Sequence, residues 1–275
     1  MPLFSGHSIL VIGGSSGIGF AVANLALEQG ALVSIASSNP TRVSNAVERL
    51  KSAHPSLEES YIRGFTIDLN TSNIEMDLEA LLTTVTGTGK INHIILTAGR
   101  ATMRPLTAIG HPYIQNELLL PLIVPSLLAK LAPRFLELSY TSSLTFYGGR
   151  LGTKPSRGWP MGAACSASLD GLTRALALDL APIRLNVVHP GATETELWGS
   201  LGGADRQKTR EYFEKTSLLG RVAGSEDVAE AFGYLIRDWN ATGRVCILVG
   251  GSVAVSERRV YVDCCCGDTQ GSCGH

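Results

Sequence analysis

The chain has 275 residues, a formal net charge of −1, 44% apolar residues and 17% charged residues. This composition supports a sizeable core and excludes disorder over most of the chain, and the balanced charge lacks the basic surplus of a nucleic-acid-binding protein. No apolar run is expected to reach the roughly 18–20 residues of a membrane span. The first residues carry no basic segment of a secretory signal, so we expect a cytoplasmic protein.

Apolar, strand-like runs alternate with helical patterns along the chain. Strands are predicted at residues 8–12, 31–36, 61–67, 91–97, 135–140, 184–188 and 244–249, and helices at 17–29, 41–53, around 78–85, 111–131, 160–180 and 226–237. Near-continuous apolar strands separated by helices indicate a parallel sheet covered on both faces. We therefore predict one doubly wound α/β domain over residues 1–258, with a substrate-covering lobe near residues 193–217 at the edge where such folds bind ligands.

The six cysteines fall into two groups. Cys165 and Cys246 lie in apolar segments and are predicted to be core thiols. The other four lie in a Cys/Gly-rich tail, residues 259–275, and their spacing does not match a zinc site. We predict a flexible tail and no metal site, with a metal or redox role of the tail as the alternative.

A glycine-rich loop follows the first predicted strand. It reads GGSSGIG from Gly13 to Gly19 and opens the first predicted helix. Glycines let the backbone approach a pyrophosphate, and a helix N-terminus offers unpaired N–H groups to it. A purely structural turn is the alternative, but the strand before the loop and the helix after it favour a dinucleotide site. The predicted contacts in the loop are Gly13, Ser15, Ser16, Gly17, Ile18 and Gly19.

The end of the second predicted strand indicates which dinucleotide binds. An NAD site needs an acidic side chain there, for the ribose hydroxyl, and this end carries none. Ser37, Ser38, Asn39 and Arg42 instead suit a 2′-phosphate, because arginine pairs with phosphate through charge-assisted hydrogen bonds. We predict NADP(H), the alternative being that the serines only begin the next helix.

With this loop, the chain resembles the short-chain dehydrogenase/reductase family from about residue 6 to residue 251. Further matches are Asp68-Leu69, Ala98-Gly99, Thr141-Ser142-Ser143 after the predicted fifth strand, and the run from Asn186 to Gly191. The resemblance implies a Rossmann-type fold in which Asp68 and Leu69 contact adenine and Ala98 and Gly99 contact its ribose. It also implies contacts to the nicotinamide and diphosphate from Pro190, Gly191, Thr193 and Thr195.

The chain departs from this family at the catalytic residues. The family uses Asn, Ser, Tyr and Lys, but Gly162 occupies the Tyr position and Ser166 the Lys position. Ser143 remains at the Ser position, and Asn116 is the candidate for the Asn position. Carbonyl reduction needs the proton that this Tyr supplies, whereas hydride addition to a cationic iminium gives a neutral amine with no oxyanion to protonate.

One branch of the family shares this departure. Fungal reductase/Diels–Alderases of malbrancheamide- and paraherquamide-type indole alkaloid biosynthesis lack the Tyr–Lys pair, and residues 154–160 resemble their Pro- and Trp-containing loop. Ser156 stands where that branch is expected to carry Asp. The other candidates near the substrate are Arg157, Trp159 and Asp170, for which a solvated loop arginine, core packing and a surface or interface acid are the alternatives.

The resemblance implies an NADP(H)-binding enzyme of fungal indole-alkaloid biosynthesis. It would reduce an imine or iminium intermediate and shape a stereoselective, Diels–Alder-type ring closure. One alternative is a redox-silent cyclase in which NADP forms only a pocket wall, and another is a catalytically dead regulatory or scaffold protein. The expected partner is an alkaloid-like small molecule, without nucleic acid or membrane, and the resemblance implies a homodimer or homotetramer.

Overall fold

The computed structural model of the chain describes residues 4–87, 89–99, 102–196, 198, 203–248 and 250. The predicted tail at residues 259–275, with its four cysteines, lies outside the described residues. Of the two predicted core thiols, Cys165 is buried and Cys246 is half-buried, and neither forms a disulfide.

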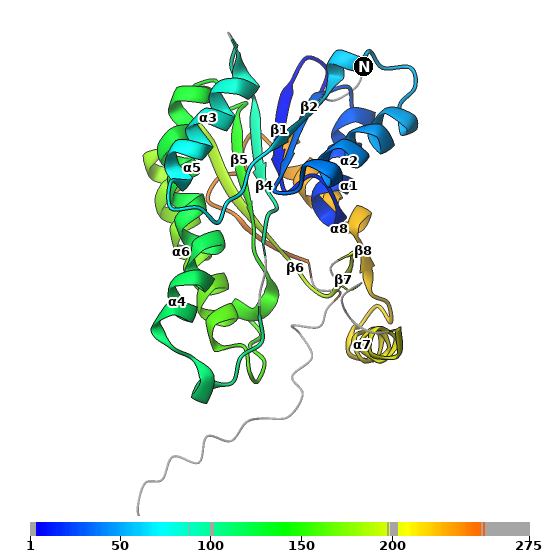
Figure 1. The fold of residues 1–275 in the computed structure, drawn as a ribbon, viewed down its shortest axis with the longest axis vertical. Helices are drawn as coiled ribbons and strands as arrows, with labels where there is room; N and C mark the ends of the chain where they lie inside the picture. Colours follow the sequence, from blue (N-terminus) through cyan, green and yellow to red (C-terminus); the bar gives the residue numbers. More distant parts are fainter. Residues whose placement is uncertain are drawn as a thin grey trace, which may run out of the picture.

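Seven parallel strands form the central sheet in the order β3-β2-β1-β4-β5-β6-β9 (Figure 1). The strands are β1 (Ser8–Ile12), β2 (Leu32–Ser37), β3 (Ile62–Thr66), β4 (His93–Leu96), β5 (Ser143–Tyr147), β6 (Arg184–Pro190) and β9 (Val245–Leu248). Strand order reverses at β1, which pairs with β2 on one side and with β4 on the other. Ligands of doubly wound sheets bind beyond the carboxyl ends of the strands at this reversal, so the topology places a site there.

Helices cover both faces of the sheet, which confirms the predicted doubly wound architecture. On one face α1 (Gly17–Glu28), α2 (Pro40–Ala53) and α8 (Ser225–Arg237) pack into a core cluster with β1 and β2. On the other face α3 (Ile74–Thr86), α5 (Val124–Phe135) and α6 (Pro160–Asp179) close a second cluster (Figure 1). Short turns of helix complete the fold: η1 (Glu59–Tyr61), η2 (Leu106–Ala108) and η4 (Arg150–Gly152).

A long helical segment crosses the second face. It consists of α4 (His111–Leu118), the π-helical turn η3 (Leu119–Ile123) and α5. Pro121 lies inside the π turn, where its missing N–H explains the interrupted α-helical ladder. The expectation that no apolar stretch reaches membrane-spanning length was wrong, because His111–Phe135 meets that criterion by length and composition alone. Its second half packs into the core, through residues such as Val124, Leu128 and Phe135, and so behaves as a core helix.

The fifth strand lies further along the chain than predicted. Residues 135–140 were predicted as this strand, but α5 ends at Phe135, and Leu136 makes only an isolated bridge to Ile91. The strand is β5, Ser143–Tyr147, between β4 and β6. Phe135 and Leu136 are apolar because they close the core beneath the helix end, so their burial produced a strand-like signal. The shift moves Thr141, Ser142 and Ser143 from the end of the strand to its beginning.

The predicted lobe contains a small second sheet and a helix. Strand β7 (Thr193–Glu194) pairs in parallel with β8 (Ala223–Gly224), and α7 (Gly203–Thr216) lies between them in the chain. Glu194 bridges to this helix through Arg206 at 2.6 Å and Arg210 at 3.1 Å. Because solvent screens these pairs, each contributes little to stability. The lobe stands beside the carboxyl end of β6 (Figure 1).

Candidate active site

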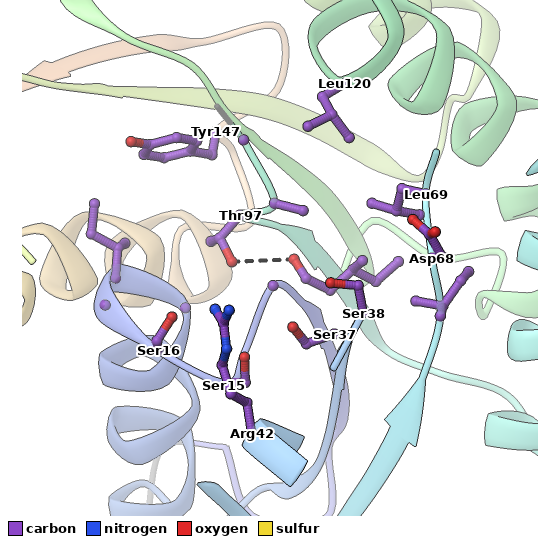
Figure 2. A pocket seen from close by; sticks show the side chains of 18 of the residues that line it. Ser15, Ser16, Ser37, Ser38, Arg42, Asp68, Leu69, Thr97, Leu120 and Tyr147 are labelled. Carbon is purple, nitrogen blue, oxygen red and sulfur yellow. Dashed lines mark hydrogen bonds between the residues drawn. The ribbon is translucent and has the colours of Figure 1, made fainter. Parts of the chain in front are cut away.

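A cavity of about 510 Å³, which we call the main groove, lies where the strand order reverses. Figure 2 shows side chains of β1, β2, β4 and their following loops arranged around it. Fourteen predicted cofactor contacts line the groove: Gly13, Ser15, Ser16, Gly17, Ile18, Gly19, Ser37, Ser38, Arg42, Asp68, Leu69, Ala98, Gly99 and Thr195. The structure thus brings together segments that are distant in the sequence, and their contacts with a nucleotide remain predictions.

The glycine-rich loop is built around close backbone contacts. A Cβ atom at Gly19 would lie 2.3 Å from the carbonyl oxygen of Gly13 and 2.4 Å from Oγ1 of Thr97, so no other residue fits there. Gly17, at a φ of 52°, opens α1 and donates its N–H to a carboxylate oxygen of Glu196 at 2.8 Å. An anionic oxygen therefore already occupies the helix N-terminus, the position at which a phosphate oxygen would be bound.

The carboxyl end of β2 presents hydroxyl groups and one cation to the groove. Ser37 and Ser38 line it together with the exposed Arg42, which forms no ion pair within the described part of the chain (Figure 2). Asn39 does not line the groove, contrary to our prediction. Its side chain instead caps α2 by accepting a hydrogen bond from the backbone N–H of Arg42 at 2.9 Å.

The four residues predicted to contact the cofactor at and after the end of β6 do not all line the same cavity. Thr195 lines the main groove, but Pro190 and Thr193 are buried and are not among the described residues that line it. Gly191 lines a separate cavity of about 250 Å³ under the lobe, together with Phe213 and Leu248. Of these four residues, only Thr195 is placed to touch a ligand of the main groove in this arrangement.

A second cavity, which we call the side cavity, adjoins the main groove. Its volume is about 240 Å³, and both cavities are lined by Ala98, Gly99, Leu120 and Tyr147. Burial raises the pKa of the Tyr147 phenol, which therefore stays protonated at neutral pH. The rest of the wall comes mainly from α4, η3, η4 and α6. Because the two cavities share four lining residues, a ligand in the side cavity would lie next to a ligand in the main groove.

The helix α6 contributes no phenol or ammonium group to the side cavity. Gly162 and Ser166 line it at the Tyr and Lys positions, and both are buried. A Cβ atom on Gly162 would lie 2.8 Å from Cδ1 of Leu151, so this leucine occupies the room into which a larger side chain would project. The loss of the pair, inferred from the sequence, therefore corresponds to a repacked wall.

Ser143 lies at the wrong edge of the sheet for catalysis. It is the first residue of β5 and pairs with His93 and Arg184, the first residues of β4 and β6. Its hydroxyl lies 2.8 Å from Nδ1 of the buried His93, whose Nε2 is 3.0 Å from Nδ1 of His7. Because the strands are parallel, both cavities open at the opposite edge. The chain that follows the fifth strand begins with Gly148 and Gly149, so the family's serine is absent there too.

Three further catalytic candidates lie outside both cavities. Asn116, Ser156 and Arg157 are exposed and are not among the described residues that line either cavity, whereas Trp159 lines the side cavity. The residue after Asn116 is the one that faces inward. Glu117 is 7% exposed, lines the side cavity and was missed by the sequence analysis. Its signal was that it is the one acidic residue in the long helical segment.

Asp170 has a structural partner instead of a place in the side cavity. Its carboxylate lies 2.6 Å from Nε2 of His189 on β6, and this pair joins α6 to the sheet. His189 is 3% exposed, and its Nδ1 has no hydrogen-bond partner among the residues that the structure describes. A Cβ atom on Gly148 would lie 2.4 Å from that nitrogen, which explains why glycine follows β5 at this point. We had not predicted a partner for either residue.

Both the sequence and the fold of the chain are similar to those of known proteins. A model of the family described as SDR-like Rossmann domain matches residues 3–255. A short-chain dehydrogenase/reductase of Stachybotrys chlorohalonatus is 44% identical over 255 residues, covering 92% of this chain and 99% of that protein. Another, malC of Malbranchea aurantiaca, is 39% identical over 246 residues, covering 88% and 93%. Its solved structure, described as the MalC reductase/Diels–Alderase, matches with a TM-score of 0.88 at 37% identity, covering 92% of this chain and 99% of that chain.

Proposed function

Because the chain belongs to the short-chain dehydrogenase/reductase family, we propose that it is an NADP(H)-dependent enzyme of fungal indole-alkaloid biosynthesis that reduces an imine or iminium. We further propose that the reduction is coupled to a stereoselective ring closure of the Diels–Alder type. The observation that carries the proposal is the combination of a fitted nucleotide groove with a side cavity from which the family's serine, phenol and ammonium are all missing.

The residues of the main groove fit NADP(H). The Gly17 N–H already binds a carboxylate oxygen of Glu196, which supports its use by a diphosphate. Ser37, Ser38 and Arg42 would hold the 2′-phosphate, since no acidic side chain stands beside them at the end of β2. A bound nicotinamide supplies hydride to a substrate, and the side cavity adjoins the groove for such a substrate.

The missing proton relay favours a carbon–nitrogen double bond over a carbonyl. When hydride adds to the carbon of an iminium, the π electron pair moves to nitrogen and a neutral amine results without any proton. A ketone would instead need a proton on oxygen, and losing a general acid costs roughly 10²–10⁴ in rate. Tyr147 and Cys165 line the cavity, but burial raises the pKa of both. Neither is paired with a lysine among the described residues of the cavity wall.

The ring closure requires only that a substrate be held folded. Leu120, Pro121, Leu151 and Leu169 give the side cavity apolar walls, and positioning in such a site can contribute several kcal/mol to a unimolecular cyclisation. The similarity to the MalC reductase/Diels–Alderase of Malbranchea aurantiaca supports this second step. A redox-silent cyclase with the same cavity is the competing proposal.

A matched pair of substrates tests the proposal. The purified chain is mixed with NADPH and either N-methyl-dihydroisoquinolinium or α-tetralone, and oxidation of the dihydronicotinamide is followed by absorbance. We expect oxidation with the iminium and a rate at least about a hundredfold lower with the ketone. Equal rates would contradict the proposed chemistry. If NADPH binds without being oxidised and an azadiene is cyclised, the protein is the redox-silent cyclase. If NADPH binds and neither oxidation nor cyclisation occurs, the result favours a regulatory protein.

A further inference from the structure

Glu117 is a carboxylate in an otherwise neutral, largely apolar wall. It lies at the end of α4, immediately before the π turn, and is 7% exposed. Burial raises the pKa of the Tyr147 phenol, and burial together with the Glu117 charge raises that of the Cys165 thiol, so both remain uncharged at neutral pH. Among the described residues that line the side cavity, Glu117 is the only acidic side chain, and none of them is basic.

The described residues satisfy this carboxylate only in part. Thr102 donates its hydroxyl to Oε1 at 2.7 Å, and Thr102 is itself held by the phenol of Tyr113, which donates to its carbonyl oxygen at 3.0 Å. No arginine, lysine or histidine of the described ranges forms an ion pair with Glu117. A carboxylate that is largely buried and has no cation beside it is unfavourable, and a positively charged ligand would offset that cost.

An aromatic ring of the same wall favours the same type of ligand. Trp159 lines the side cavity, and indole is the ring with the strongest attraction for a cation over its face. Glu117 and Trp159 line the same largely apolar cavity, and a carboxylate together with an indole suits an organic cation. A neutral ligand would instead leave the carboxylate unpaired, and an anionic ligand would be repelled.

We propose that the side cavity selects organic cations, of the iminium or ammonium type, through Glu117 as their counter-ion and the Trp159 ring as a second contact. This inference rests on the proposed function and names the specificity-determining residue of its substrate site.

Binding of a charged probe and its neutral isostere tests the inference without any turnover. N-methylquinolinium and methylnaphthalene are titrated into the full chain, with and without NADP⁺, and tryptophan fluorescence reports the Kd. We expect the cation to bind at least about tenfold more tightly than the neutral probe in the wild-type protein. Equal affinities in the wild-type protein would overturn the inference, whatever the variants do.

Glu117→Gln isolates the charge, because glutamine keeps the acceptor for Thr102. We expect the cation to lose its advantage, with the Kd of the neutral probe unchanged within about twofold. Glu137→Gln, at an exposed position after α5, is the matched control and should retain the preference. A retained preference in Glu117→Gln would overturn the inference. If the protein oxidises NADPH with the iminium substrate but shows no cation preference, this inference is wrong and the proposed reduction stands. If it prefers the cation but does not oxidise NADPH, only the proposed reduction is wrong.

Discussion

The two cavities of this protein use different parts of the chain. The main groove is shaped by backbone, with the close approach of Gly13 and Gly19 and the N–H of Gly17 at the start of α1, and only its β2 end depends on side chains. The side cavity is defined by side chains, and there Gly162 and Ser166 have replaced the groups that the family uses. A site made of backbone tolerates few substitutions, whereas a site made of side chains can be emptied and reused on the same scaffold.

The strongest test of this contrast is Gly19→Ala in the groove. The added Cβ would lie 2.3 Å from a backbone oxygen, so we expect a loss of about 1–3 kcal/mol in the free energy of unfolding and at least about a tenfold weaker binding of NADP⁺. Urea denaturation and calorimetry measure the two effects. Gly171→Ala in α6, with no atom within 4 Å of its Cβ, is the control and should be neutral or stabilising by up to about 1 kcal/mol.

The side-chain end of the main groove is tested by Arg42→Ala. Removing a charge-assisted pair with the 2′-phosphate should weaken NADPH binding by about 10–100-fold and leave NADH binding nearly unchanged. Competitive titration with the two nucleotides gives both values. Arg49→Ala, on the same helix but with its guanidinium 4.0 Å from the Phe20 ring centre, should change neither. An equal loss for both nucleotides would show that Arg42 does not contact the 2′-phosphate.

The amino edge of the sheet should respond to pH through its buried histidines. Burial lowers the pKa of His93 well below 6.5, with smaller contributions from the charges of His7 and Arg184. The unfolded chain therefore binds more protons than the folded chain just below pH 6.5, and stability falls as the pH is lowered through that value. His93 alone contributes up to about 1.4 kcal/mol per pH unit. Urea midpoints between acidic and neutral pH should show a flatter profile for His93→Gln, and parallel profiles would contradict this account.

Ser143→Ala should have the smallest effect, although this serine matches the family's motif in sequence. It removes one hydrogen bond to His93 at the edge away from both cavities, so we expect a loss of about 1 kcal/mol in stability and no change in the rate of NADPH oxidation. Initial rates and thermal unfolding of the same preparations measure both. A large fall in the rate of NADPH oxidation with unchanged stability would contradict this account and indicate that Ser143 takes part in catalysis.

The sequence was sufficient for the fold because each strand carries its own apolar run and each helix its own period. It failed at β5, where Phe135 and Leu136 are apolar to close a helix end, and this error carried Ser143 into the proposed site. A strand signal records burial, and burial alone does not distinguish a helix end from a strand.

The candidate site was predictable where glycines and a strand end define it, as at Gly17 and Ser37. It was less predictable where one helical turn decides which side chain faces inward. Asn116 and Glu117 are neighbours, yet one is exposed and the other buried, because the turn before Pro121 sets the orientation of the helix. Asp170 likewise pairs with His189 on β6, nineteen residues further along the chain, and no local sequence pattern predicts such a contact.

The carboxylate of Glu196 on the Gly17 N–H means that the free protein carries its own competitor for this donor. One amide proton serves one strong acceptor, so an incoming phosphate oxygen and Glu196 exclude each other there. Nucleotide entry would therefore displace the Glu196 carboxylate from this amide, and departure of the nucleotide would let the hydrogen bond form again. Cofactor binding and the placement of one acidic side chain would be linked through a single proton.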